Sequence, residues 1–152
     1  MVPDSVEREV QINAPIEVVW SIVTEPRHIG SWLSDSAEVD LRVGGDLVLA
    51  WDQMGSTVAT VERVEPPNAF AFRWVSPEPD RDSDVREGHF TLVEFLLRSQ
   101  DDGTLLRVVE SGFAELAGSE ERNAELVARH AGGWGGFLDR LVAHLAAVDV
   151  AG

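Results

Sequence analysis

The chain of 152 residues contains no cysteine and no lysine. Without cysteine it has no disulfide framework, no thiolate zinc site and no cysteine nucleophile. No stretch resembles a signal peptide and no apolar run reaches the roughly 18 residues of a membrane span, so we expect a cytoplasmic protein. All twelve basic residues are arginine and the formal net charge is −15, which repels phosphate backbones and anionic lipid. The composition therefore predicts neither nucleic acid nor membrane as a partner.

Motifs that would supply a metal site or a nucleophile are also missing. His130 and His144 are separated by about 21 Å along a helix that rises 1.5 Å per residue, so they cannot share an ion. His28 and His89 lie in other segments and show no ligand spacing. There is no Gly-x-Ser-x-Gly elbow and no phosphate-binding loop. The sequence predicts no bound metal and no cofactor.

Glycine is concentrated at one place, the run Gly132-Gly133-Trp134-Gly135-Gly136. The run interrupts a segment that otherwise has the pattern of one amphipathic helix from Ser119 to about Val148. Each glycine inside a helix costs about 1 kcal/mol relative to alanine. We interpret the run as close packing against a sheet or as a kink or break, and contact with a ligand is the alternative.

Hydrophobic periodicity predicts one strand, two short helices, about six further strands and a long helix. The strands are expected over residues 6–12, 39–43, 47–51, 57–65, 69–75, 90–98 and 104–111. The helices are expected from Pro15 to before Pro26, over Arg27–Leu33 and over Ser119–Val148. Residues 76–88 are expected to form a polar surface loop. Short turns between strands imply an antiparallel sheet, so we predict a single α+β domain over residues 1–152 with an ordered core of about 6–148.

Alternate residues of four strands would face the long helix, and these inward positions are almost all apolar or aromatic. They are Leu47, Leu49 and Trp51; Phe70, Phe72 and Trp74; Val93, Phe95 and Leu97; and Leu106, Val108 and Glu110. The helix offers a stripe with spacings of three and four: Leu126, His130, Trp134, Phe137, Leu141, Leu145 and Val148. Such a lining suits a hydrocarbon or aromatic ligand, but a core filled by its own side chains gives the same pattern.

Glu110 and His130 are the candidates for chemistry. A carboxylate turned into an apolar cavity would have a raised pKa and serve as a general acid or base, whereas a position at the strand end would leave it in solvent. His130 lies on the apolar stripe and could meet Glu110, forming a proton shuttle or a hydrogen-bonding site for a ligand. The alternative for His130 is a core histidine with satisfied hydrogen bonds.

Taken in order, several short pieces resemble the START-like, or SRPBCC, superfamily. The branch most similar is the family named after the activator of the heat-shock-protein-90 ATPase. The matching pieces cover nearly the whole chain: Ala14-Pro15, Val19-Trp20, Thr24, Trp32-Leu33, Gly44-Gly45, Val64-Glu65-Pro66-Pro67, Phe70, Phe72, Trp74, Gly103-Thr104, Leu106, Val108, Glu110-Ser111-Gly112-Phe113, His130, Gly133-Trp134, Leu138 and Leu141.

The resemblance implies a helix-grip fold, in which a curved antiparallel sheet wraps around the long C-terminal helix and two short helices follow the first strand. It also implies an apolar cavity between sheet and helix. Members of the superfamily bind lipids, polyketides, hormones or other apolar molecules, and some are cyclases or dehydratases. The chaperone-activating members carry a further N-terminal domain, for which this chain has no room, so the resemblance does not favour a chaperone partner.

We therefore expect a protein that binds a small apolar or aromatic molecule without catalysis. The first alternative is a cyclase-like or dehydratase-like enzyme with Glu110 and His130 as acid and base, and the second is a protein-binding module for a chaperone. The oligomeric state stays open, a homodimer included. The candidate ligand-binding residues are Trp32, Leu49, Trp51, Phe70, Phe72, Trp74, Val93, Phe95, Val108, Glu110, His130, Trp134 and Phe137.

Overall fold

The structure is a computed structural model that describes residues 4–52, 55–74, 90–115 and 119–151. The loop expected at residues 76–88 lies outside these ranges. The elements in chain order are β1 (Ser5–Ile12), α1 (Ile16–Thr24), α2 (Pro26–Trp32), β2 (Ser36–Val39), β3 (Asp46–Trp51), β4 (Gly55–Glu65), β5 (Ala69–Trp74), β6 (Thr91–Gln100), β7 (Gly103–Ser111), the 3₁₀ turn η1 (Phe113–Glu115) and α4 (Glu120–Ala151).

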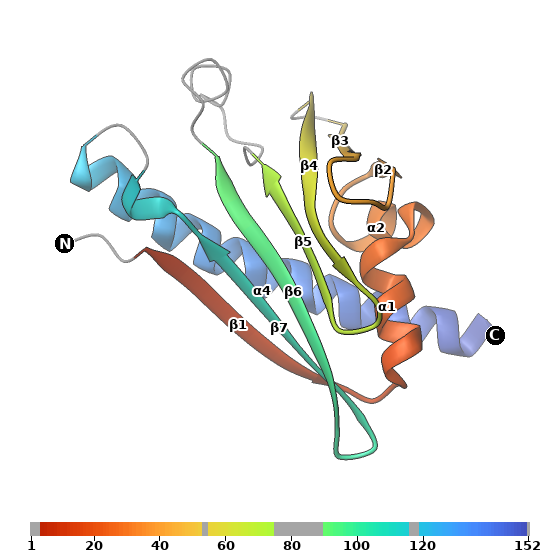
Figure 1. Cartoon of the computed structure of the whole chain (residues 1–152). Coiled ribbons are helices and arrows are strands. Elements are labelled where there is room, and N and C mark those ends of the chain that lie inside the picture. The colour runs from red at the N-terminus through yellow and green to blue at the C-terminus, as the bar shows by residue number, and fades with distance from the viewer. Residues whose placement is uncertain (1–3, 53–54, 75–89, 116–118, 152) are drawn as a thin grey trace.

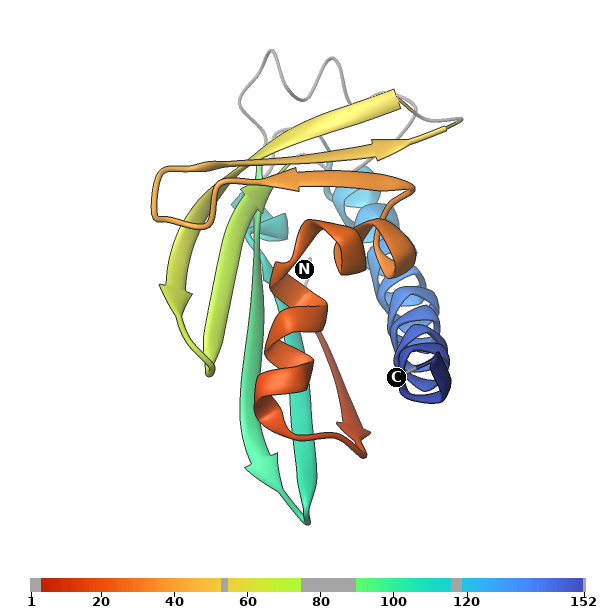
Figure 2. The ribbon, with the colours of Figure 1, turned by 90° about the vertical axis from the view of Figure 1, so that its right-hand side faces the viewer.

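The seven strands form one curved sheet in the order β1-β7-β6-β5-β4-β3-β2, and every neighbouring pair is antiparallel. The helix α4 runs along the concave side of this sheet, and α1 and α2 lie beside it on the same side (Figures 1 and 2). The predicted helix-grip fold is confirmed.

The inward registers are also as predicted. Along β6, the residues Val93, Phe95 and Leu97 are buried while their neighbours are more exposed, which is the two-residue period of a sheet with one covered face. Polar pairs occupy the outer face, such as Arg107 of β7 with Glu7 of β1 at 2.7 Å. The hairpin between β6 and β7 turns at Asp101 and Asp102, both with positive φ, as a two-residue type I′ turn requires.

The segment that leads into β3 departs from the prediction of a strand over residues 39–43. The strand β2 instead ends at Val39, and residues 40–45 form a turn closed by hydrogen bonds from Arg42 N to the Asp40 carbonyl and from Gly45 N to the Arg42 carbonyl. Gly44 has a φ of 86°, which an L side chain rarely adopts. The apolar residues of this segment resembled a strand, but the glycine pair fixed a turn.

The helix α4 is continuous across the glycine run, so the expected break is wrong. The expected close packing is wrong as well, because a Cβ added at any of these four glycines would meet no atom within 4 Å. The helix is held instead by residues between and after the glycines, since Trp134, Leu138 and Leu141 are buried against the core. At its start, the Ser119 hydroxyl accepts a hydrogen bond from the Arg122 amide at 3.0 Å, an N-terminal cap.

Within the part of the chain that the structure describes, no helix combines the length and the apolar content needed to cross a bilayer.

Candidate functional site

The carboxylate of Glu110 lies between the sheet and α4 and is fully buried. Its Oε2 accepts hydrogen bonds from the Trp74 indole at 3.0 Å and from the Thr91 hydroxyl at 2.5 Å. Its Oε1 is 2.7 Å from Nδ1 of His130 and 2.9 Å from the indole nitrogen of Trp134, which donates to it. The structure thus brings Glu110 of β7 together with His130 of α4, and it places Glu110 inside the protein rather than in solvent.

The environment of Glu110 has opposing effects on its pKa. Burial favours the neutral acid and raises the pKa, but the hydrogen bond and charge of His130, with the hydrogen bonds from Thr91 and Trp74, outweigh burial and leave the pKa below its usual value. An ionised carboxylate only accepts hydrogen bonds, so the facing Nδ1 of His130 carries a proton. The raised pKa expected from the sequence is therefore wrong, because the cluster supplies donors that the strand pattern does not reveal.

Aromatic rings surround this carboxylate. We call them the aromatic layer: Trp32, Phe70, Phe72, Trp74, Phe95, Trp134 and Phe137. All except the half-buried Phe137 are at most 2% exposed.

Phe95 lies at the centre of the aromatic layer. Its ring centroid is 5.8 Å from that of Trp32 on α2 and 5.9 Å from that of Trp134 on α4. The rings of Trp74 and Trp134 are 5.9 Å apart and both donate to Glu110, so the layer and the carboxylate form one continuous cluster.

The remaining candidate residues divide by what their side chains contact. The indole of Trp32 donates to the Ile22 carbonyl at 2.9 Å, and that of Trp51 donates to the Leu33 carbonyl at 3.1 Å. These two tryptophans anchor the α1–α2 segment to the fold, although Trp32 also belongs to the aromatic layer. Leu49, Val93 and Val108 are at most 1% exposed and lie on the inner face of the sheet.

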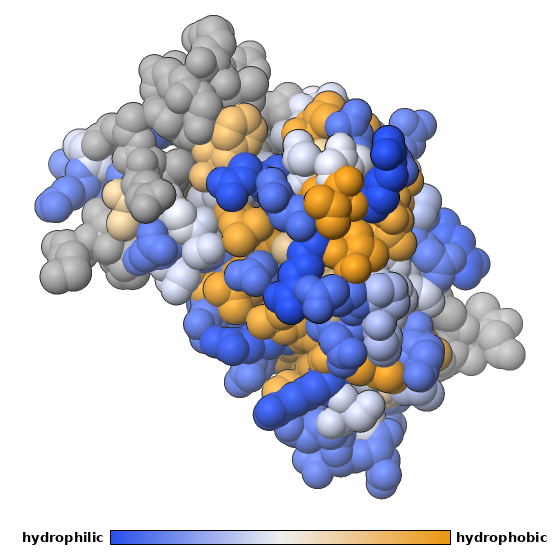
Figure 3. Space-filling model, viewed as in Figure 1, coloured by the Kyte–Doolittle hydropathy of each residue, from blue (hydrophilic) through white to orange (hydrophobic). Residues whose placement is uncertain are grey.

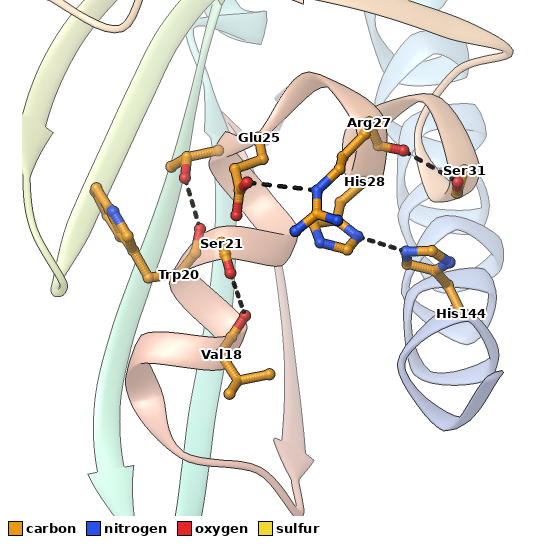
Figure 4. Close-up of polar contacts among 9 residues, drawn as sticks. Val18, Trp20, Ser21, Glu25, Arg27, His28, Ser31 and His144 are labelled. Carbon is orange, nitrogen blue, oxygen red and sulfur yellow. Dashed lines mark hydrogen bonds and ion pairs between the residues drawn. The ribbon is translucent and has the colours of Figure 1, made fainter. Parts of the chain in front are cut away.

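The sequence analysis did not predict a contact between two of the histidines. His28 on α2 and His144 on α4 face each other, with Nδ1 of His28 2.8 Å from Nε2 of His144 (Figure 4). The available signal was that each histidine lies next to buried positions of its own helix, His28 before Ile29 and His144 before Leu145. Among the described residues, no group of three histidine or carboxylate side chains is arranged to hold a metal ion.

Several solved structures are similar to this chain. Protein MLL2253 from Mesorhizobium loti superposes with a TM-score of 0.77 at 27% identity, over 93% of this chain and 96% of that one. DynU16, a protein in the dynemicin biosynthetic locus, gives 0.74 at 25% identity over 95% of this chain, which spans 48% of DynU16. The Aha1 dimer from Colwellia psychrerythraea gives 0.70 at 17% identity over 93% of each chain, a likeness of fold alone. No curated protein matches.

A family model gives the assignment. The model described as Activator of Hsp90 ATPase homolog 1-like protein matches residues 13–146, which include the glycine run, both members of the Glu110–His130 pair and every strand of the sheet except β1. The START-like resemblance is thereby confirmed, and the chain belongs to the family of Activator of Hsp90 ATPase homolog 1-like proteins.

Proposed function

We propose that the protein binds a small apolar or aromatic molecule between the curved sheet and α4, beside the carboxylate of Glu110. The observation that carries this proposal is a fully buried charge set in a layer that is otherwise aromatic. Ligand sites are mostly apolar with a few convergent polar groups, and groups with perturbed pKa values gather there.

A contribution to stability is a weak explanation for the presence of a buried carboxylate at this position. Apolar residues of similar volume often replace a buried ion pair without loss of stability, so a retained charge favours a role in recognition. The half-buried Phe137 lies 5.6 Å from Trp134, at the edge of the aromatic layer. A flat ring that enters beside Phe137 would stack on Trp134 and bring a polar substituent toward the cluster around Glu110. DynU16, which comes from a biosynthetic locus, is compatible with a small-molecule ligand for this fold.

The first experiment is native mass spectrometry of freshly purified protein, compared with its denatured mass. We expect a bound species that is lost on denaturation, and its readdition at a hundredfold excess over its Kd should stabilise the protein by about 2.7 kcal/mol.

A second experiment tests the position of the binding site, with 1-naphthol as a neutral aromatic probe. Trp134→Phe should weaken its binding several-fold, because the variant loses ring area and the indole donor. The matched control is Trp20→Phe, since Trp20 of α1 is half-buried and outside the aromatic layer. Equal weakening in both variants, or no binding to the wild type, would contradict the proposal.

The hydrogen bond between Glu110 and His130 is compatible with the alternative that the protein is an enzyme, but it changes the roles of the two residues. Because the carboxylate is ionised and accepts only, His130 would be the acid–base group and Glu110 would position it. A measured activity that survives both Glu110→Gln and His130→Ala would remove the pair from any mechanism. The chaperone partner suggested by the family's name stays the weakest alternative.

For assembly we propose a homodimer through the outer face of the sheet. An apolar area lies over β3 and β4 (Figure 3), where Val58 is 56% exposed opposite Val48. Sedimentation should show a dimer that Val58→Asp converts to a monomer, and a wild type that is monomeric at every concentration would refute this. A cytoplasmic location remains a prediction from the sequence.

A further inference from the structure

The two histidines that face each other across α2 and α4 form a hydrogen bond and not an ion site. Their nitrogens are 2.8 Å apart and their ring centroids 5.1 Å, so each ring points its nitrogen directly at the other (Figure 4). Two metal ligands would instead direct their lone pairs toward one point beside that line. The bond joins positions 116 residues apart in the chain.

The chemistry of imidazole determines when this bond exists. A neutral imidazole donates from one nitrogen and accepts at the other, and a protonated one only donates. The bond therefore forms when both rings are neutral, and it is strengthened by charge when one ring is protonated. When both are protonated, two N–H groups and two positive charges face each other, so the bond is lost and becomes a repulsion.

We propose that His28 and His144 form an acid-sensitive latch, which holds α2 against α4 while at most one of the two rings is protonated and releases α2 when both are.

The groups around the pair cause the release of α2 to occur at acid pH. Burial, then the charge of Arg27, then that of His144 lower the pKa of His28 from its usual 6.5, and Glu25 opposes them. The contribution of His28 to stability is accordingly present above 6.5 and is lost as the pH falls through its lowered pKa. Arg27 is 3.4 Å from Glu25, which partly offsets its charge.

Among the described side chains, the other charged ones on the elements packed against α2 and on the adjoining turns of α4 are exposed. They are Glu17 of α1, Glu38 of β2, and Asp139 and Arg140 of α4.

The latch adjoins the aromatic layer. His28 and Trp32 are one turn apart on the same face of α2, and Trp32 covers Phe95 with ring centroids 5.8 Å apart. Movement of α2 away from α4 would therefore uncover Phe95 from the side on which α1 and α2 lie (Figure 2). That this uncovering admits a ligand rests on the proposed function, whereas the latch itself does not.

The absence of cysteine makes the test direct, because two introduced cysteines can be spin-labelled without background. Labels at Ser31→Cys on α2 and Ala147→Cys on α4, both at exposed positions, report the distance between the helices by pulsed electron paramagnetic resonance. We expect one narrow distribution at pH 8 and a shift to longer, broader distances at the acid pH at which ¹⁵N chemical shifts show both rings protonated.

The control is the same labelled protein with His144→Gln. A glutamine amide still accepts from a protonated His28, so the bond persists with a single titrating ring, and the distance should not change between the same two pH values. His28→Asn is the reciprocal variant, because the asparagine amide lies where Nδ1 lies in histidine, and it should behave alike, which covers a failure of either variant to fold. Unchanged distances in the histidine pair with both rings protonated, or an equal shift in the two amide variants, would overturn the latch. Neither readout involves a ligand, so the ligand proposal is tested separately.

Discussion

Replacing Glu110 with alanine is expected to lower the free energy of unfolding by about 3–5 kcal/mol, as removal of one partner of a buried pair does. The loss arises from the groups left behind: two indole N–H groups, the Thr91 hydroxyl and the Nδ1–H of His130 would lose their acceptor inside the protein. Native domains are stable by about 5–15 kcal/mol, so the variant should lose a large share of its total stability. Urea denaturation at pH 7 measures the change.

Two further variants test this explanation. Glu110→Gln retains the shape but turns one oxygen into an N–H group that faces donors, so we expect an intermediate loss of about 2 kcal/mol. Glu62→Gln removes an exposed carboxylate 3.4 Å from Arg73 and should change stability by less than about 1 kcal/mol. If Glu110→Ala were as mild as Glu62→Gln, the four donors would have found water and the buried cluster would be wrong.

The sign of the pH dependence follows from the lowered pKa of Glu110. Its contribution to stability is present above the usual carboxyl value of about 4.5 and is lost as the pH falls through the lower folded value.

Filling the glycine run is expected to stabilise the protein by about 3 kcal/mol. The triple variant Gly132→Ala, Gly133→Ala, Gly136→Ala adds about 1 kcal/mol per exposed site, because alanine loses less backbone freedom on folding into a helix. Apart from the neighbouring residues and backbone of the helix itself, no atom lies within 4 Å of the added methyl groups, so no steric cost opposes the gain. The midpoint of thermal unfolding should rise by about 6–12 °C.

Gly103→Ala is the matched control from the sheet. At this position an added Cβ would overlap the carbonyl oxygen of Ile12 on β1, so the same chemical change should destabilise. A loss of stability in the triple helix variant would show instead that something occupies the face of α4 that the glycines leave open. If the variant is stabilised but binds the ligand more weakly, that face borders the entrance to the site.

Much of the fold was predictable because it follows from local periodicity. Strand alternation placed Phe95 and Val108 inward, and the helix stripe placed Trp134 against the sheet, since both patterns depend only on near neighbours in the chain. The fate of Glu110 was not predictable in this way. Its burial depends on donors from β5, β6 and α4, and no window of sequence contains all of them.

The histidine pair and the course of the helix through the glycine run were also not predictable from local sequence patterns. His28 and His144 meet because α2 crosses α4 at one particular turn, and neither helix pattern contains that crossing. The glycines weaken the helix locally, so a kink or break was one interpretation of the sequence beside close packing. Burial of Trp134 and Leu138 outweighs that cost, which is the usual order of importance for helices in folded proteins.

The place of β1 in the sheet has a consequence for the order in which the chain folds. Its residues pair with β7, so that Val6 lies opposite Glu110, about a hundred positions later. Such a contact has a high sequence separation, which slows folding because the long loop must close before the pairing stabilises anything. During synthesis the first strand therefore emerges without its partner and waits until almost the whole sheet has left the ribosome. Until then β1 has no partner and β6 has an open edge, and this interval is when the chain is most exposed to pairing with another copy.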